Sequence, residues 1–319
     1  MKIDPPYRIV NRLHIDAKAE HARLVAGLRA APAHIEPKYF YDELGCALYA
    51  AICQLDEYYP TRTERAIFQE HREAIAAAIG RGGTFVDLGA GDCCKAMSWL
   101  PFIEPIRYLA VDIAGPSLET ALGNMAPEFP DTEMLGLVTD FSQRLEIPAE
   151  LLAAPVTMFY PGSSIGNFTP GAAVEFLRQV RGAAGGGALL IGVDAKKPKP
   201  RLDAAYADAL GVTAAFNLNA LRHINRVLKA GFTETNWRHA GFYNEALGRI
   251  EMHLEAVREE TIQLDGMQRI FRAGERIHSE NSYKYARREF EDLLRESGYQ
   301  SIQAWSNAAQ EFWVFLARE

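Results

Sequence analysis

Short apolar segments alternate with helical segments through the middle of this sequence, and no other feature constrains the fold as strongly. The helical stretch 172–180, for example, lies between two apolar segments and begins with Thr169 as N-cap and Pro170 in the first turn. Strands that alternate with helices build a parallel, doubly wound α/β sheet. The sequence predicts five such strands, over residues 84–88, 108–112, 133–138, 155–160 and 188–193.

The segments on either side of this region predict further elements. A helix is expected over 17–28, and another begins at Thr61, which has capping-box spacing with Glu64, and runs to Gly80. The chain closes with a helix over 285–296 and two strands, 301–305 and 312–316. We expect these two strands to add an antiparallel pair to the parallel sheet.

Residues 201–282 interrupt the alternation and are too many for a simple connection between sheet strands. Helices are expected over 202–210 and 216–230, followed by strands over 233–237, 249–256 and 261–271. We therefore expect two domains. The sheet domain comprises residues 61–200 and 283–319, and a smaller α+β domain, expected to bind the substrate, comprises residues 1–60 and 201–282.

The composition excludes several classes of function. The formal net charge is −7, and no long run of Lys and Arg could follow a phosphate backbone, so we expect no nucleic-acid partner. No segment reaches the roughly 18 apolar residues of a membrane span. The four cysteines form no CxxC pair and the eight histidines no HExxH pair, so we expect no metal site. These features favour a reduced, cytoplasmic protein, and we expect a monomer.

A glycine turn follows the first predicted strand, where Gly89 and Gly91 flank Ala90. Glycines permit a tight turn and let a ligand approach the backbone closely. Alone, this Gly-x-Gly is equally typical of an ordinary strand-to-helix turn, because the third glycine of the dinucleotide fingerprint is missing.

Residues at the next two strand ends give the turn a context. Asp112 ends the second strand, where a carboxylate can accept hydrogen bonds from ribose hydroxyls. Asp140 and Phe141 follow the third strand and suit an adenine amino group and an adenine ring face. The spacing favours S-adenosylmethionine over NAD, because a pyrophosphate would be repelled by Asp92 beside the turn.

Three longer stretches make the sequence resemble a known family. They are 58–64 (YYPTRTE), 162–170 (GSSIGNFTP) and 211–217 (GVTAAFN), supported by 249–252 (RIEM) and 280–282 (ENS). Together they resemble the L-histidine Nα-methyltransferases of ergothioneine biosynthesis, which are class I methyltransferases that use S-adenosylmethionine. The resemblance extends from about Lys38 to the C-terminus, and it implies the Rossmann-like sheet with a terminal antiparallel pair that this family shares.

The resemblance also implies roles for individual residues. The positions that would contact S-adenosylmethionine are Gly89, Gly91, Lys95, Asp112, Asp140 and Phe141. Those that would bind the substrate are Gly162, with Asn167 and Tyr206 at its α-amino-acid end, Tyr58, Glu280 and Ser282 at the imidazole, and Met252 packed beside it. Tyr41 would lie near the reacting amine, so Tyr41 and Asn167 are the catalytic candidates. The sequence departs from the family pattern at Asp92-Cys93-Cys94 and at Tyr160-Pro161.

Without the resemblance, ordinary structural roles would serve for the same positions. These are packing for Tyr58 and Tyr206, a turn for Asn167, a solvated charge in a strand-to-helix loop for Glu280, an N-cap for Ser282 and a surface position for Lys95.

The expected reaction is three successive methyl transfers from S-adenosylmethionine to the α-amino group of L-histidine. The products are hercynine (Nα,Nα,Nα-trimethylhistidine) and S-adenosylhomocysteine. Methyl transfer to an amine needs alignment and a free lone pair rather than a metal, and a nearby tyrosine with its water can take the proton. Two alternatives stay open: transfer to another amino acid or a tryptophan derivative, and a catalytically silent binding subunit.

Overall fold

The chain divides into two compact units in the computed structural model, which describes residues 6–13, 16–141 and 144–319. The first unit comprises Met1–His14, Arg62–Ala195 and Tyr285–Glu319. The second comprises Ile15–Thr61 and Lys196–Lys284.

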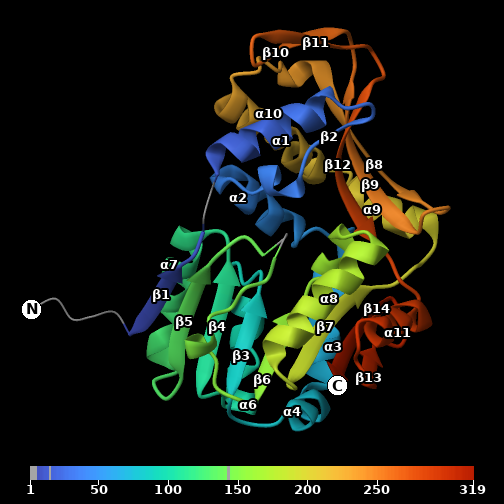
Figure 1. Cartoon of the computed structure of the whole chain (residues 1–319). Coiled ribbons are helices and arrows are strands. Elements are labelled where there is room, and N and C mark those ends of the chain that lie inside the picture. Colours follow the sequence, from blue (N-terminus) through green and yellow to red (C-terminus); the bar gives the residue numbers. More distant parts are fainter. Residues whose placement is uncertain (1–5, 14–15, 142–143) are drawn as a thin grey trace, which may run out of the picture. The chain divides into compact units, whose positions relative to one another are not determined.

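The first unit is built on one eight-stranded sheet (Figure 1). Its strand order is β1 (Tyr7–Asn11), β5 (Glu133–Val138), β4 (Arg107–Asp112), β3 (Thr84–Leu88), β6 (Val156–Tyr160), β7 (Ala188–Asp194), β14 (Phe312–Arg318) and β13 (Ser301–Ser306). All pairs from β1 to β7 are parallel, whereas β14 runs antiparallel to both β7 and β13. Strands β3, β6 and β7 are buried along their whole length, as expected where helices cover both faces. The predicted doubly wound sheet with a terminal antiparallel pair is confirmed.

Helices connect these strands, and one of them differs from its prediction. Thr169 caps the long helix α8 (Pro170–Ala184), as expected, by accepting from the Ala172 amide. The helix expected from Thr61 to Gly80 is instead two helices, α3 (Tyr59–Glu70) and α4 (Arg72–Ile79), so Thr61 lies inside the first turn and forms no capping box. The other helical segments are α5 (Cys94–Met97), α6 (Leu100–Ile103), α7 (Gly115–Met125), α11 (Arg287–Glu296), η2 (Ala126–Glu128), η3 (Ala149–Leu151) and η4 (Ser164–Asn167).

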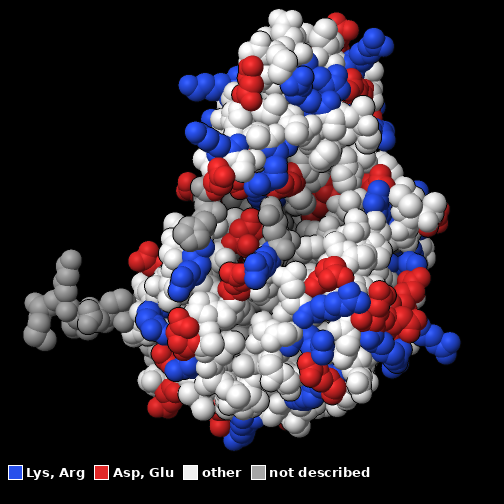
Figure 2. Space-filling view, in the orientation of Figure 1, with Lys and Arg blue, Asp and Glu red and all other residues white. Residues whose placement is uncertain are grey.

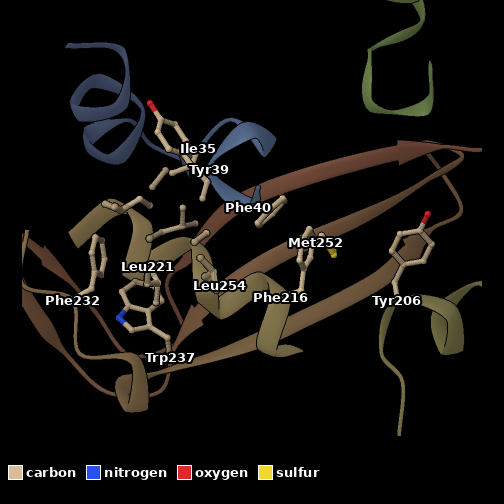
Figure 3. Close-up of a cluster of buried hydrophobic side chains, with 14 of the residues drawn as sticks. Ile35, Tyr39, Phe40, Tyr206, Phe216, Leu221, Phe232, Trp237, Met252 and Leu254 are labelled. Atoms are coloured by element: carbon tan, nitrogen blue, oxygen red, sulfur yellow. The ribbon is translucent and has the colours of Figure 1, made fainter. Parts of the chain in front are cut away.

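The second unit combines helices with two small sheets, as predicted for an α+β domain. The larger sheet has the order β2 (Ala33–His34), β12 (Arg276–Tyr283), β9 (Arg249–Ala256) and β8 (Trp237–Asn244), and β10 (Glu260–Leu264) forms a hairpin with β11 (Met267–Phe271). The helices are α1 (Ala17–Arg29), η1 (Pro37–Phe40), α2 (Glu43–Ile52), α9 (Lys199–Tyr206), α10 (Val212–Leu228) and η5 (Glu234–Asn236). Figure 3 shows part of the core of this unit, in which Phe40, Phe216 and Met252 come from η1, α10 and β9.

Four elements differ from the sequence predictions. Strand β1 pairs with β5, so residues 7–11 pack with the first unit rather than with the rest of residues 1–60. The strand expected over 233–237 is the short helix η5, and β8 begins only at Trp237. The segment 261–271 folds back on itself because Asp265 and Gly266 adopt positive φ angles of 51° and 76°. Strand β12, where a loop was expected, is described below with the site.

The buried carboxyl of Asp87 on β3 yields a test of stability. Burial raises its pKa to about 7, although the Tyr108 hydroxyl donates to its Oδ2 at 2.9 Å. In the folded protein this carboxyl keeps its proton at pH values where the unfolded chain, with an aspartate pKa of about 3.9, has lost it. The free energy of unfolding should therefore fall as pH rises from about 4 to about 7, by at most about 4 kcal/mol.

We predict that Asp87→Asn removes this dependence and is more stable than the wild type at pH 8, since the amide keeps an acceptor for Tyr108. Urea unfolding at pH 5 and pH 8 measures both effects, with the exposed Asp131→Asn as control. If the free energy of unfolding changes equally between pH 5 and pH 8 in wild type and in Asp87→Asn, Asp87 ionises normally in the folded state.

Candidate active site

The carboxyl ends of β3, β4 and β5 bring the predicted glycine turn and its acidic neighbours together in the first unit. Beyond β3 the chain turns through Gly89 and Gly91, whose φ angles are 73° and 55°. A Cβ on Gly91 would meet no atom within 4 Å, and one on Gly89 would meet only the Phe141 ring, at 3.8 Å. The turn therefore leaves open space beside its backbone, with an aromatic ring close by.

Asp112 joins the end of β4 to the glycine turn. Its Oδ2 accepts from the Gly91 amide at 2.9 Å and its Oδ1 accepts from the Ala114 amide at the same distance. Two backbone donors fix the direction of this half-buried carboxylate. Each oxygen keeps a further lone pair, so the carboxylate can also accept from a pair of ligand hydroxyls.

Phe141 presents an aromatic face immediately after β5. Its ring stacks at 29° and 6.0 Å on Phe176 of α8 and meets the edge of Tyr160 at 6.3 Å. Tyr160, one of the departures from the family pattern, is buried and packs against Phe176. This departure therefore supports the position of the Phe141 ring through a shared neighbour.

A buried carboxylate that the sequence analysis placed in a capping box connects two other predicted residues. Glu64 on α3 is only 1% exposed, and its Oε2 accepts from Lys95 Nζ at 2.7 Å while its Oε1 accepts from the Gly162 amide at 2.6 Å. Lys95 is thus half of an ion pair and not merely a surface lysine. Glu64 lies three and four residues before the buried Ile67 and Phe68, so it is on the inner face of the helix. This spacing could have predicted from the sequence that Glu64 is buried.

The two cysteines of the other departure from the family pattern, Asp92-Cys93-Cys94, have different environments. Cys93 is fully buried with a φ of 60°, and burial raises its pKa to about 12, so it is a packed thiol rather than a nucleophile. Cys94 is exposed, and its amide donates to Asp92 Oδ1 at 3.1 Å.

In the second unit, β12 contains two of the residues predicted to bind the substrate. Glu280 and Ser282 are two apart on this strand and therefore share a face, and Glu280 lies opposite Met252 of β9. The loop interpretation of Glu280 and the N-cap interpretation of Ser282 are wrong, because both residues pair within the sheet. Glu280 is half-buried and Ser282 is 5% exposed.

Ser282 belongs to a buried polar cluster. The Tyr206 hydroxyl donates to Ser282 Oγ at 3.1 Å, and Lys284 Nζ donates to both of these oxygens at 2.9 Å. Lys284 is 1% exposed. Sequence reasoning missed it, although it continues the alternation of Glu280 and Ser282.

Aromatic side chains surround these polar groups within the second unit. Tyr58 is buried and meets the edge of the Tyr206 ring at 6.0 Å. Tyr41 contacts Tyr49 and Phe216, with ring centroids 5.8 and 5.6 Å apart. Tyr41 is 40% exposed overall, but desolvation of its hydroxyl and the negative charge of Glu280 raise its pKa well above the ordinary value. Tyr41 is therefore a neutral phenol near neutral pH.

The remaining predicted residues all lie in the first unit: Asp140 is half-buried after β5, and Gly162 and Asn167 lie beyond β6. Gly162 has a φ of 79°, and Asn167 is an exposed residue at the end of η4. The pair expected at the α-amino-acid end of the substrate, Asn167 and Tyr206, is thus divided between the two units.

Within residues 6–13, 16–141 and 144–319, no three His, Cys, Asp or Glu side chains are grouped as a metal ion would require. His14, one of the eight histidines, lies outside these ranges. No helix in the same part of the chain has the length and apolar character of a bilayer span. On the face shown in Figure 2, acidic and basic side chains are interspersed.

Comparison with known proteins relates the chain to characterised relatives. The histidine N-alpha-methyltransferase of Mycolicibacterium smegmatis is 35% identical, covering 97% of this chain and 98% of the relative. That of Mycobacterium tuberculosis is 33% identical over 95% and 97%. A 4-dimethylallyltryptophan N-methyltransferase of Claviceps purpurea is 27% identical over 92% and 94%.

A solved structure and a family model complete the comparison. A possible exported protein from Bordetella parapertussis has a similar fold, with a TM-score of 0.50 at 12% identity over 96% of this chain and 97% of that one. The family model described as "Histidine-specific methyltransferase, SAM-dependent" matches residues 20–319, where SAM is S-adenosylmethionine. Because this match covers nearly the whole chain, the protein belongs to the family of histidine-specific, S-adenosylmethionine-dependent methyltransferases.

Proposed function

We propose that this protein methylates the α-amino group of L-histidine, in three successive transfers that yield hercynine for ergothioneine biosynthesis. The observation that carries the proposal is on β12, where Glu280 and Ser282 share a sheet face and Glu280 pairs with Met252 of β9. Membership in a histidine-specific family supports it. A carboxylate acceptor and a hydroxyl suit the two nitrogens of an imidazole, whereas an indole has only one N–H and no acceptor nitrogen.

S-adenosylmethionine, when bound, supplies an electrophilic methyl group on a sulfonium. The donors and open space at the strand ends of the first unit fit this molecule. Asp112 would accept from the ribose hydroxyls, and Phe141 would cover the adenine, with Asp140 at its amino group. Gly89 and Gly91 would let the ligand approach the backbone. Lys95, held by Glu64, would face the methionine end.

The chain's own residues would prepare the amine. Asn167 and Tyr206 would hold the α-amino-acid end, Gly162 would shape the strand end beside Asn167, and Tyr58 would pack on the imidazole side. The amine must lose its proton before it can react, and a tyrosine that stays neutral can accept a hydrogen bond from the amine and pass the proton to water. Tyr41 is such a tyrosine. Its aromatic neighbours would attract the methylated cation.

One experiment can identify the substrate without presupposing that it is histidine. The protein is incubated with S-adenosylmethionine and all twenty amino acids, and the products are analysed by mass spectrometry. We predict mono-, di- and trimethylated histidine only. A methylated product of tryptophan or of another amino acid would replace histidine as substrate, and the absence of any product would favour a binding subunit.

Asp112 offers a test of the S-adenosylmethionine site. We predict that Asp112→Ala raises the Kd for S-adenosylhomocysteine by roughly 10- to 150-fold, because ligand hydroxyls lose a charged acceptor worth about 1.5–3 kcal/mol. Asp112→Asn should lose less, since its amide oxygen still accepts. Calorimetry measures the affinities, with the exposed Asp131→Ala as control and thermal unfolding to verify folding. Wild-type affinity in a folded Asp112→Ala protein would place the ligand elsewhere.

Glu280 offers a test of specificity. In wild type, an apolar substrate side chain would cover this half-buried carboxylate without donating a hydrogen bond to it, which is unfavourable. We predict that Glu280→Ala lowers kcat/KM for histidine by roughly 100-fold or more and narrows the gap to tryptophan, while the Kd for S-adenosylhomocysteine changes little. The exposed Glu259→Ala, in the same unit, is the control. A histidine-to-tryptophan ratio that stays constant would remove Glu280 from substrate recognition.

A further inference from the structure

Lys284 occupies a position that the reaction itself does not explain. It follows Glu280 and Ser282 at alternate positions of one extended segment, so the three side chains form a row on one face with a carboxylate at one end and an ammonium at the other. At 1% exposure, Lys284 is among the largest fully buried side chains of the described chain. A buried ammonium costs free energy unless acceptors surround it, so its hydrogen bonds are informative.

The bonds of Lys284 determine which way the neighbouring hydroxyls can donate. A lysine ammonium has three donors and no acceptor. Tyr206 Oη and Ser282 Oγ must therefore both accept from Nζ, each at 2.9 Å. Ser282 also accepts from the Tyr206 hydroxyl at 3.1 Å, so both of its lone pairs are used.

One hydroxyl hydrogen remains for a ligand. Since Ser282 Oγ accepts twice, the Ser282 O–H is left as a donor. In the structure Tyr206 donates to Ser282, so the surplus hydrogen is on Ser282. Ser282 therefore offers a ligand a donor, and the nearby positive charge repels a second cation.

We propose that Lys284 makes the site select the neutral imidazole of its substrate. The inference rests on the proposed function and adds the protonation state of the bound ring. A neutral imidazole has one N–H, which suits Glu280, and one unprotonated nitrogen, which suits the hydroxyl donor. An imidazolium has two N–H groups and would direct one of them at a donor beside the ammonium. Lys284 is thus a positioning residue that acts through Ser282 and Tyr206.

The titration of other ionisable groups near this cluster must be distinguished from the titration of the substrate's imidazole ring. They include Glu280 on β12, Tyr58 before α3, Tyr49 on α2 and Lys196 before α9, the last lying near Gly248 beside the Lys284 carbonyl. His239 on β8 also contacts Tyr206, with its Nε2 2.7 Å from the Tyr206 carbonyl oxygen, and burial lowers the pKa of its imidazole. Phenols and ammonium groups ordinarily titrate well above pH 8 and carboxyls below pH 5. A ligand whose ring does not titrate between these limits reports any contribution of the protein itself. Triazolylalanine is such a ligand, because a 1,2,4-triazole keeps an N–H and an acceptor nitrogen but is a far weaker base than imidazole.

The experiment measures the Kd of histidine and of triazolylalanine between pH 5.5 and 8, by calorimetry with S-adenosylhomocysteine present. In wild type, the Kd of histidine should rise about tenfold per pH unit below about 6.5, whereas that of triazolylalanine should stay nearly constant. In Lys284→Met, the two hydroxyls can rotate to accept, and the charge of Glu280 favours imidazolium. The histidine curve of this variant should therefore flatten or reverse at low pH.

Lys284→Gln serves as a second variant if the methionine variant does not fold, because its amide can both donate and accept; its histidine curve should flatten as well. The exposed Lys18→Met should keep the wild-type curves. A flat histidine curve in wild type, or the same acid dependence in wild type and a folded Lys284 variant, would overturn the inference while leaving histidine as substrate. Failure of the wild type to bind histidine at any pH would overturn the proposed function and this inference with it.

Discussion

The carboxylate of Glu64 is the contact on which the arrangement of the strand ends in the first unit depends. It ties α3 to the lysine after the glycine turn and to the backbone beyond β6, so three segments distant in sequence meet at one side chain. Burying such a charge is unfavourable unless its oxygens are fully used, and both oxygens accept here. The neighbouring strand leaves room for it: a Cβ on Gly192 of β7 would lie 2.0 Å from Glu64 Oε1. The burial of the Glu64 carboxylate therefore requires a glycine at position 192 of β7.

The two units use the same principle with opposite charges. In the first, a buried carboxylate fixes a cation and an amide; in the second, a buried cation fixes two hydroxyls. In both cases the groups that can meet a ligand have their direction set beforehand by a charge behind them. Donors and acceptors oriented in advance need no reorganisation when charge develops, and such groups contribute strongly to rate and selectivity. Methyl transfer to an amine depends on alignment of this kind.

The sequence predicted those features that depend on local pattern. The central strands, the Thr169 cap and the acidic residues at successive strand ends follow from apolar periodicity and short-range spacing, and the structure brings Asp112 and Gly91 into contact as the order of strands requires. The features that it did not predict depend on distant partners. Glu64 has the spacing of a cap, but its acceptors are used by groups 31 and 98 residues away. Strand β12 is polar along most of its length, so apolar alternation does not predict it, and the buried Ser282 is satisfied by Tyr206, 76 residues away. The roles of the site residues toward ligands rest on the family resemblance, since spacing alone leaves their structural interpretations open.

The bridge between Ala195 and Tyr285 has a consequence for how this protein can diverge. The segment Lys196–Lys284 leaves the first unit at Ala195 and returns at Tyr285, and these two residues pair directly, with the Tyr285 amide donating to the Asp194 carbonyl at 3.2 Å. An inserted segment whose ends already meet adds little strain to its host, because loop closure depends only weakly on the length enclosed. Lineages that inherit this scaffold can therefore lengthen, shorten or recombine the insertion while the register of the eight-stranded sheet stays the same. Changes inside the insertion, which carries Tyr206, Met252, Glu280 and Ser282, can thus leave the glycine turn and Asp112 of the first unit unaltered.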